Sequence, residues 1–286
     1  MIRPVVALAT GAAWPDLDED GALLIAALAE RGVDARPVVW DDARHDWAGD
    51  DLVVLRNTWD YIVRLREFTR WADAVPRLMN PAAVVRWNTD KRYLRDLAAA
   101  GVPVVATTWL APGEMFRAPA GEYVVKPTVS AGARDTARYG PAETGAATAQ
   151  VAALHAAGRD VMVQPYLHAV DTAGETSLLL FDGAFSHAAR KAAILAPRAG
   201  VRQDLVSRSY VTPTTATAEQ LACAEKVLAA VPGGASLLYA RVDLVPGDDG
   251  RPVLLELEVI EPSLFLTLAG GATERFAAAI ARRVRR

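Results

Sequence analysis

Two β-rich runs near the carboxyl end of the chain flank a segment of turn-forming residues, and this feature constrains the fold most. The runs are Leu238–Val245 and Val253–Val259, and they enclose Pro246–Pro252, which contains two glycines and two aspartates. Glycine and aspartate in such a segment favour tight turns, so we expect the two runs to form a β-hairpin.

Four charged side chains lie at alternate positions on this predicted hairpin. Because side chains alternate along a strand, Arg241 and Asp243 share one face of the first strand. Glu256 and Glu258 share one face of the second strand for the same reason. If the strands pair in register, three carboxylates and one guanidinium meet on one patch, which is costly among apolar neighbours without a cation. Because Mg²⁺ prefers oxygen ligands, the pattern predicts a metal site, with a solvated charged face as the alternative.

Length, charge and cysteine content exclude several classes of protein. The chain has 286 residues, of which 52% are hydrophobic, so it is long enough for one multi-lobed enzyme or two domains. The net charge is −3 and no strongly basic block lies outside the C-terminal tail, which argues against nucleic acid as the main partner. The one cysteine, Cys223, excludes an internal disulfide, and no apolar run approaches membrane-spanning length. We therefore expect a soluble cytoplasmic protein with no membrane partner.

The N-terminal part of the chain alternates strand-like and helix-like segments. This order predicts a small parallel sheet, in which ligands bind beyond the carboxyl ends of the strands. The predicted strands are Val5–Thr10, Ala35–Trp40 and Leu52–Leu55, and the predicted helix is Gly21–Arg31.

Two loops leave the carboxyl ends of these strands, and both carry candidate substrate ligands. In the loop Arg56–Tyr61, Arg56 could hold a carboxylate with two hydrogen bonds, and Thr58 could accept a bond from an amino group. Thr58 is an equally good helix N-cap. In the loop Trp14–Asp20, Asp18 is likewise either a capping residue or a substrate ligand.

A lysine ends an apolar strand in the middle of the chain and precedes a loop of small residues. Lys126 follows Tyr123–Val125, where an ammonium group is unusual unless it reaches an anion. In the loop Thr128–Asp135, small residues such as Ser130 and Gly132 let backbone N–H groups approach phosphate oxygens. The segment is not a P-loop, and no dinucleotide-binding glycine pattern follows a strand.

Several further elements are predicted from local patterns. We expect a helix to begin at Pro262-Ser263, with free N–H groups that could bind an acceptor carboxylate or an acyl phosphate near Ser263. The other segments are an extended run at Val84–Trp87, a helix from Asn88 to about Ala100 that Asn88 or Thr89 caps, a strand at Val104–Thr108, and a long polar loop at Ala196–Thr214 that favours a lid or substrate loop.

These motifs resemble those of the ATP-grasp superfamily. Asp243, then Glu256-Leu-Glu258, then Pro262-Ser263 is similar to its metal-binding end, although most members have Asn where this chain has Glu258. Glutamate is still an oxygen ligand. Over nearly the full length, the chain resembles the D-cycloserine-forming ligases of this superfamily in the ordered motifs DKRYL, VVKPT, QPY, GET, FDG, SHA, RVDLV and EPSL. The RNTWDY loop differs from theirs, so identical chemistry does not follow.

The resemblance implies an α/β ATP-grasp fold, in which a small parallel N-terminal domain precedes two lobes that clasp a nucleotide. We expect the N-terminal domain at residues 1–84, the central lobe at 85–167, and the C-terminal lobe with the metal site at 168–286.

The resemblance also implies roles for individual residues. Lys91, Lys126 and Lys191 would contact the nucleotide phosphates, and Arg241 would act with Lys191 in catalysis by stabilising the transferred phosphate. The hinge between the lobes would recognise adenine through its backbone, and one acid would bind the ribose hydroxyls. The hinge residues are Gln164, Tyr166 and Leu167, and the ribose candidates are Glu175, which we favour, and Asp171.

The implied activity is ADP-forming ligation of a carboxylate and an amine through an acyl phosphate, with ATP and Mg²⁺ or Mn²⁺ as cofactors. In the cycloserine-forming relatives both groups lie in one amino-acid-like molecule, so the product is a ring. The alternatives are a ligase that adds an amino acid to a peptide or protein tail and a nucleotide-binding protein without catalysis. Homodimers are common in the superfamily, so a dimer is also an expectation.

Overall fold

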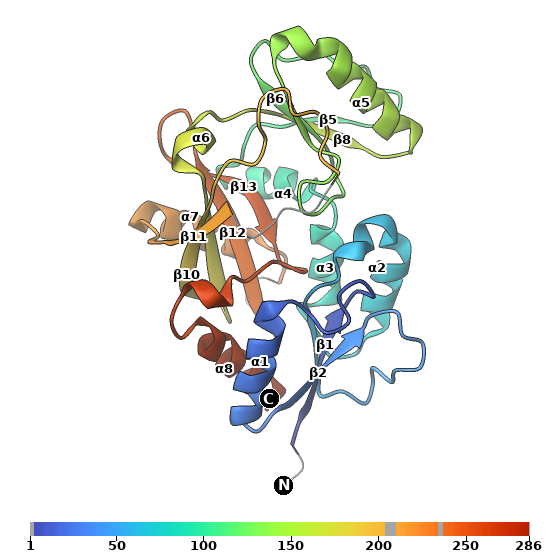
Figure 1. The fold of residues 1–286 in the computed structure, drawn as a ribbon, viewed down its shortest axis with the longest axis vertical. Coiled ribbons are helices and arrows are strands. Elements are labelled where there is room, and N and C mark those ends of the chain that lie inside the picture. The colour runs from blue at the N-terminus through green and yellow to red at the C-terminus, as the bar shows by residue number, and fades with distance from the viewer. Residues whose placement is uncertain (1–2, 204–209, 234–236, 286) are drawn as a thin grey trace.

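Three β-sheets form the frame of the molecule (Figure 1). The structure, a computed structural model, describes residues 3–203, 210–233 and 237–285. We name the sheets by their order in the chain: the N-terminal sheet, the central sheet and the C-terminal sheet. In Figure 1 the central sheet lies at the top and the N-terminal sheet at the lower right.

The N-terminal sheet is parallel throughout, as the alternation of strands and helices predicts. Its strand order is β2-β1-β3-β4. Strand β1 is fully buried from Val6 to Ala9, which is typical of a parallel sheet covered on both faces. The strands are β1 (Val5–Thr10), β2 (Asp34–Val39), β3 (Leu52–Leu55) and β4 (Leu78–Met79).

The central sheet is antiparallel and has the order β5-β8-β6-β7. Helix α5 (Thr144–Ala156) covers one face, where Val151 and Leu154 pack against Tyr123, Val125 and Val163 (Figure 1). The other face is turned toward the C-terminal sheet. The strands are β5 (Thr108–Leu110), β6 (Tyr123–Pro127), β7 (Ala137–Tyr139) and β8 (Val161–Pro165).

The C-terminal sheet is also antiparallel, with the order β11-β10-β9-β12-β13. Even-numbered residues of β12, such as Val242, pack with Val227 of helix α7 (Ala218–Ala230). Thr217 caps α7 by accepting from the Gln220 amide. The strands are β9 (Glu175–Phe181), β10 (Ala184–Lys191), β11 (Val211–Thr214), β12 (Tyr239–Pro246) and β13 (Pro252–Glu258).

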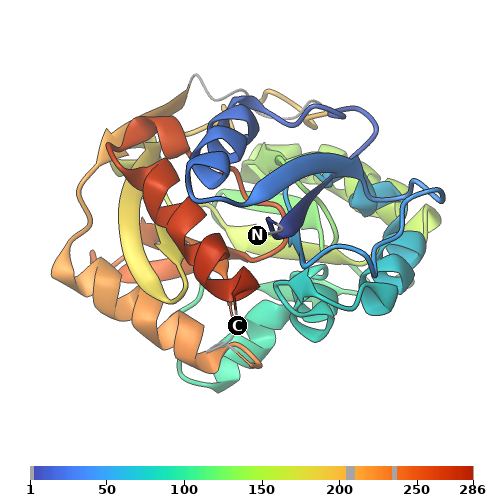
Figure 2. The same cartoon turned by 90° about the horizontal axis from the view of Figure 1, so that it is seen from below.

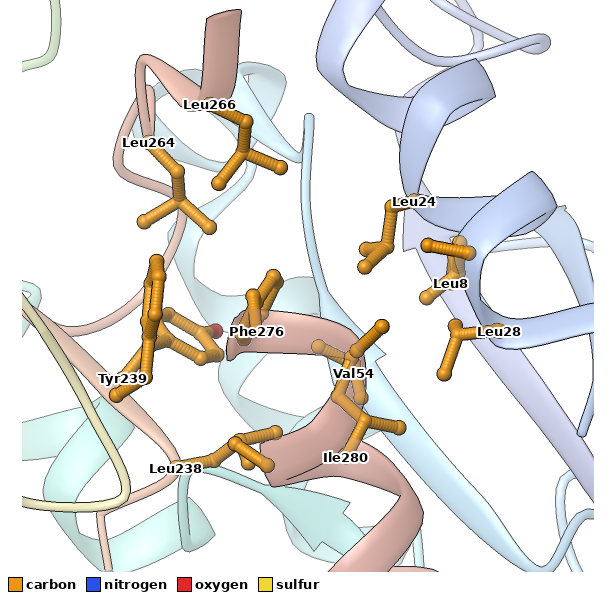
Figure 3. Close-up of a cluster of buried hydrophobic side chains, with 14 of the residues drawn as sticks. Leu8, Leu24, Leu28, Val54, Leu238, Tyr239, Leu264, Leu266, Phe276 and Ile280 are labelled. Atoms are coloured by element: carbon orange, nitrogen blue, oxygen red, sulfur yellow. The ribbon is translucent and has the colours of Figure 1, made fainter. Parts of the chain in front are cut away.

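Helix α1 (Glu19–Glu30) and helix α8 (Ala272–Val284) lie side by side and join the two ends of the chain (Figure 2). Leu24 and Leu28 of α1 share one hydrophobic cluster with Phe276 and Ile280 of α8 (Figure 3). This cluster fixes the N-terminal sheet against the odd-numbered face of the C-terminal sheet, because Tyr239 belongs to it as well.

The remaining helical segments are short. Within the described residues, no helix is long and apolar enough to cross a membrane. The segments are α2 (Leu65–Ala74), α3 (Ala82–Asn88), α4 (Tyr93–Ala99), α6 (Ala169–Ala173) and the 3₁₀ turns η1 (Trp59–Val63), η2 (Pro141–Glu143) and η5 (Leu266–Leu268).

Two predictions around residue 88 are wrong. The run expected to be extended is helix α3, because its Val84, Val85 and Asn88 side chains are buried, and this packing outweighs the β propensity of valine. Asn88 ends α3 instead of opening the next helix. Its side chain bonds the Leu257 carbonyl (2.9 Å) and the Val259 amide (3.2 Å), so it connects α3 to strand β13.

Three other local predictions also need correction. The strand expected at Val104–Thr108 begins only at Thr108, and Val104 makes a single bridge to Leu254. No helix begins at Ser263, since the backbone forms only the 3₁₀ turn η5 further on. The loop predicted at Ala196–Thr214 ends in strand β11, and its residues 204–209 lie outside the described residues. The two predicted boundaries between the three domains stay predictions.

We predict that Leu24→Ala lowers the free energy of unfolding by about 2–5 kcal/mol, because it opens a cavity between α1 and α8. Leu23→Ala on the same helix is the matched control, since Leu23 is 43% exposed, and it should cost less than about 1 kcal/mol. Urea unfolding followed by circular dichroism measures both. Equal losses for the two variants would contradict the packing described here.

Candidate active site

A cavity of about 700 Å³ lies between the central and C-terminal sheets and is closed on one side by the N-terminal part of the chain. The lining side chains come mainly from loops of the N-terminal sheet, from the central sheet and the loop after β6, and from the C-terminal sheet. Those that carry charge or hydrogen-bonding groups include Asp18, Trp59, Lys91, Lys126, Ser130, Gln164, Glu175, Lys191, Arg241, Glu256, Glu258, Glu261 and Ser263.

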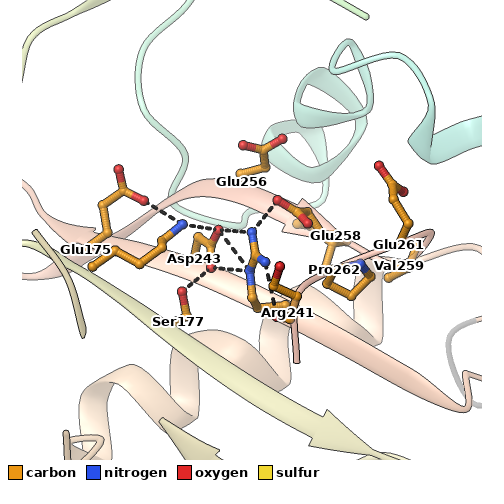
Figure 4. Close-up of polar contacts among 12 residues, drawn as sticks. Glu175, Ser177, Arg241, Asp243, Glu256, Glu258, Val259, Glu261 and Pro262 are labelled. Atoms are coloured by element: carbon orange, nitrogen blue, oxygen red, sulfur yellow. Dashed lines mark hydrogen bonds and ion pairs between the residues drawn. The ribbon is translucent and has the colours of Figure 1, made fainter. Parts of the chain in front are cut away.

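The predicted hairpin forms and pairs in register. Arg241 of β12 lies opposite Glu258 of β13, and Asp243 lies opposite Glu256. The four side chains therefore project from one face of the C-terminal sheet, as Figure 4 shows. This is the face that α8 covers nearer to Tyr239, so the apolar core ends where the charged patch begins.

Asp243 is the most buried of the four, with 1% of its surface exposed. Its carboxylate accepts from the Ser177 hydroxyl (2.6 Å), the Lys191 ammonium (2.7 Å) and, through two nitrogens, the Arg241 guanidinium (3.0 Å each). Burial alone would raise the pKa of Asp243, but Arg241 and Lys191 outweigh it and hold this pKa well below its usual range. The group is therefore ionised at neutral pH.

The two glutamates of β13 differ in their electrostatic surroundings. Glu256 pairs with Lys91 (3.1 Å), and although burial opposes ionisation, Lys91 and Lys126 lower its pKa. Glu258 pairs with Arg241. Burial and the nearby Glu256 carboxylate still raise the pKa of Glu258 to about 7. The wall of the cavity thus holds more carboxylate than its cations neutralise.

The three predicted nucleotide lysines all reach this cavity. Lys91 donates to the Ser130 carbonyl (2.6 Å), so it is not the surface lysine that its position before α4 allows. Lys191 lies between Asp243 and Glu175, 2.8 Å from the Glu175 carboxylate. Lys126 is buried, and burial lowers its pKa. Within the part of the chain that the structure describes, Lys126 makes no ion pair.

The small-residue loop after β6 forms part of the same wall. Ser130, Gly132 and Ala133 line the cavity, and both Gly132 and Ala133 have φ of +60°. A left-handed backbone here exposes peptide N–H groups instead of side chains, which suits contact with an anion.

The hinge residues Gln164, Tyr166 and Leu167 line the cavity beside this loop. The Gln164 side chain donates to the Thr107 hydroxyl (3.0 Å), and Gln164 pairs with Val124 in the central sheet. Of the two ribose candidates, Glu175 lines the cavity. Asp171 does not: it accepts from the Tyr166 hydroxyl (2.5 Å) and points toward Arg138.

The substrate-binding predictions divide into two groups. Asp18 lines the cavity and also caps α1 by accepting from the Gly21 amide (3.2 Å), so both of its predicted roles are compatible with the structure. Ser263 lines the cavity without a helix behind it. Arg56 and Thr58 are 1% and 0% exposed and lie behind the cavity wall. In this structure neither can contact a ligand in the cavity.

Arg56 supports the wall instead. Its guanidinium donates to the Pro262 carbonyl (3.2 Å), and the neighbouring Trp59 indole donates to the Glu261 carbonyl (3.1 Å). Trp59 also packs edge-on against Trp14, with ring centroids 5.1 Å apart, and both rings line the cavity. The loop after β3 therefore builds the cavity through Trp59, while its arginine holds the backbone of residues 260–262.

Glu261 is a cavity residue that the sequence patterns did not identify. It is 6% exposed and lines the cavity next to Glu258. Burial and the Glu258 carboxylate raise the pKa of Glu261 to about 8. The sequence signal for Glu261 is a charged residue directly after the apolar pair Val259-Ile260, next to the Pro262-Ser263 motif.

The predicted metal ligands fit a divalent cation in donor chemistry but are not arranged around one. In residues 3–203, 210–233 and 237–285, no group of three or more histidine, cysteine or acidic side chains is placed to hold a metal ion. Asp243 faces Arg241 and Lys191 instead. The oxygen donors of Glu256 and Glu258 are those that Mg²⁺ prefers, and a cation beside them would favour ionisation of Glu258, whose pKa burial and Glu256 raise.

The raised pKa of Glu261 predicts a pH dependence of stability. The folded-state pKa is about 8 and the reference value is 4.5, so the folded state holds this proton more tightly than the unfolded chain. The stabilising contribution is complete below about pH 4.5 and is lost as the pH rises through 8. Glu261→Gln, which does not titrate, should flatten the fall of the melting temperature between pH 5 and 9. An unchanged slope would contradict the assignment.

Comparisons with known proteins agree with this geometry. The family described as "D-cycloserine synthetase DcsG, N-terminal domain" matches residues 6–80. The cycloserine biosynthesis protein DcsG of Streptomyces lavendulae is 39% identical over 298 residues, which cover 98% of this chain and 99% of that protein. The crystal structure of D-cycloserine synthetase DcsG superposes with a TM-score of 0.90, at 39% identity over 98% of this chain and 99% of that one.

Two more distant structures share the fold. A D-alanine–D-alanine ligase from Bacillus anthracis, solved with ATP, has a TM-score of 0.66 at 15% identity over 100% of this chain and 98% of that one. The ATP-grasp ligase PsnB, solved with its minimal precursor, Mg and ADP, has a TM-score of 0.65 at 18% identity over 98% of each chain. The chain therefore belongs to the family of the D-cycloserine synthetase DcsG, and it is a C–N bond-forming ligase with the ATP-grasp fold, as its motifs predict.

Proposed function

We propose that this protein is an ATP-dependent, ADP-forming ligase that activates the carboxylate of a small amino-acid-like substrate as an acyl phosphate and then joins it to a nitrogen of the same molecule. One observation carries the proposal. A single cavity is lined by Lys126 and the glycine-containing loop of the central sheet, and by Lys191, Arg241, Glu256 and Glu258 of the C-terminal sheet. Phosphoryl transfer requires this combination of cations and metal-binding carboxylates.

The nucleotide would lie along the loop and the hinge. Lys126 supports this placement most strongly, because its buried ammonium forms no direct ion pair within the described residues and is stabilised only from a distance by the Glu256 and Glu175 carboxylates. Burying a charge without a partner is costly, and a phosphate would remove that cost. The loop N–H groups around Gly132 would add contacts to phosphate oxygens, the hinge at Gln164 to Leu167 would receive the adenine, and Glu175 would bind the ribose.

The metal would be held by Glu256 and Glu258, with Asp243 as the third predicted ligand. Mg²⁺ held there would supply positive charge to neutralise the charge that develops on the phosphate during transfer. Neighbours of the same fold have been solved with ATP, and with Mg and ADP. Asp243 also has a second function in this structure, since it holds Lys191 and Arg241 in position.

The residues of this chain would act in two steps. In the first, the substrate carboxylate attacks the terminal phosphorus of ATP, which breaks the bond to ADP and forms an acyl phosphate. Lys191 and Arg241 would stabilise the transferred phosphate, since the network around Asp243 holds both cations rigidly. In the second, the substrate nitrogen attacks the acyl carbon, loses a proton and expels inorganic phosphate. Arg241 would stabilise the negative charge on the tetrahedral oxygen.

The amino-acid-like substrate would occupy the side of the cavity formed by Trp14, Trp59, Asp18 and Ser263. The relative with 39% identity takes part in cycloserine biosynthesis, which supports a substrate whose carboxylate and nucleophile belong to one molecule. Ring closure within one molecule is favoured because the reacting groups are already held together. A homodimer stays a prediction.

ADP release with Mg²⁺-ATP and O-substituted serines of both configurations, singly and in pairs with other amino acids, tests this function. Release with one compound alone is expected. Release that requires two compounds would replace ring closure by intermolecular ligation. Binding of ATP without ADP release by any compound would contradict a small amino-acid-like substrate.

We predict that Glu256→Gln reduces ATP turnover by at least about a thousandfold while the melting temperature and circular dichroism stay near those of the wild type. The side chain contacts the cavity and Lys91 but supports no apolar core. Glu219→Gln, at an exposed position on α7, is the control and should retain full turnover. Near-normal turnover in the Glu256 variant would disprove the metal assignment.

Lys126→Ala should weaken ATP binding by about tenfold to a hundredfold, because a charge-assisted contact to phosphate is lost. Lys226→Ala removes an exposed lysine of the same chain and should leave ATP affinity unchanged. Calorimetric titration with a non-hydrolysable ATP analogue and Mg²⁺ measures both affinities. Equal affinities would remove Lys126 from the nucleotide site.

A further inference from the structure

A buried glutamate on the cavity wall has no part in the phosphoryl transfer proposed above. Glu261 is 6% exposed and lines the cavity. Among the residues that the structure describes, no lysine, arginine or histidine forms an ion pair with it. In Figure 4 its side chain stands apart from the network that joins Glu258 to Arg241, and no contact is drawn to it.

The backbone that carries Glu261 is held at three consecutive carbonyl groups. The Tyr239 hydroxyl lies 2.6 Å from the Ile260 carbonyl. The Trp59 indole donates to the carbonyl of Glu261 itself, and Arg56 donates to that of Pro262. All three donors come from buried or half-buried side chains in other elements. The backbone position of Glu261 is therefore set by the fold, and its side chain extends from this fixed point in the cavity wall.

The nearby cations of the protein are already engaged elsewhere. Lys91 bonds the Ser130 carbonyl and pairs with Glu256. Arg241 pairs with Asp243 and Glu258. Burial and the Glu258 carboxylate raise the pKa of Glu261, and Lys91 opposes them only in part, since it forms no ion pair with Glu261. A cation supplied by a ligand would oppose this rise in pKa.

The place of Glu261 in the cavity limits which ligand that is. Its own carbonyl is bonded to Trp59, which packs on Trp14, and both rings come from loops of the N-terminal part of the chain, whereas the hinge residues Gln164–Leu167 lie at and just after the end of strand β8 of the central sheet. A nucleotide has no positive group to offer there. An amino-acid-like substrate has one, because its α-amino group is an ammonium at neutral pH.

We propose that the Glu261 carboxylate binds the α-ammonium group of the substrate and so determines that the substrate is an amino acid with a free amino group. The inference rests on the proposed function, since it assigns the acceptor end of the same cavity. Contact with Glu261 at the ammonium would leave the substrate carboxylate to face Arg241. A charge-assisted hydrogen bond of this kind fixes orientation as well as affinity.

The test compares Glu261→Gln with wild type, using an O-substituted serine that supports ADP release and the N-acetyl derivative of the same compound. The wild type should prefer the free amine by at least about tenfold in kcat/KM. The Gln variant should lose most of this preference, and Glu261→Asp should restore part of it. Glu219→Gln should behave as the wild type. The affinity for ATP and the Mg²⁺ concentration at half-saturation should stay within about twofold.

The proposal would be overturned if the wild type showed no preference for the free amine, or if the Gln variant kept the full preference. It would also be overturned if the Gln variant needed a very different Mg²⁺ concentration for half-saturation, since Glu261 would then be a metal ligand. Calorimetry with D-serine and N-acetyl-D-serine beside a non-hydrolysable ATP analogue separates this inference from the ligase function. If no compound causes ADP release, the ammonium contact is still supported when the wild type binds D-serine more tightly than N-acetyl-D-serine and the Gln variant does not. Equal or absent binding overturns it.

Discussion

A row of ion pairs across the C-terminal sheet, buried at Asp243 and Arg241 and half-buried at its two ends, is the constraint on which the rest of the site depends. Its members alternate in sign from β9 and β10 through β12 to β13, in the order Glu175, Lys191, Asp243, Arg241 and Glu258. Loss of one partner from a buried pair leaves the other charge uncompensated, at a cost of about 3–5 kcal/mol. The strands must therefore keep the register that places these groups together, and the same register exposes Glu256 and Glu258 to the cavity.

The N-terminal part of the chain completes the site from outside the sheet. Its sheet is fixed by the α1–α8 contact, and its loop after β3 reaches the backbone of residues 260–262 through Arg56 and Trp59. Apolar packing between the two ends of the chain thus positions polar groups at the acceptor side of the cavity. Membership of the DcsG family excludes the alternative of a nucleotide-binding protein without catalysis. The loop after β3 bears on the identity of the substrate, because Trp59 lines the cavity.

The hairpin, the parallel sheet and the unusual position of Lys126 were predictable because each depends on a local pattern, whereas Lys91 and Lys191 were predicted from the resemblance to ATP-grasp enzymes. Alternation of side chains puts Arg241 and Asp243 on one face whatever the rest of the chain does. The role of Arg56 was not predictable, since its acceptor at Pro262 lies 206 residues away. The place of Glu261 in the cavity wall was not predicted for a similar reason. It depends on hydrogen bonds that Trp59 and Tyr239, both distant in the sequence, make to the backbone of residues 260 and 261. Local propensity also failed at Val84–Trp87, where burial decided for a helix.

The central claim is that the substrate carboxylate is activated as an acyl phosphate, and the fate of its oxygen tests this directly. The substrate would be prepared with ¹⁸O in both carboxylate oxygens and turned over with Mg²⁺-ATP, and the released inorganic phosphate analysed by mass spectrometry. The account predicts one ¹⁸O atom in each phosphate, because the oxygen that attacks phosphorus leaves with it. Product formation with unlabelled phosphate, or with AMP and pyrophosphate in place of ADP, would contradict it.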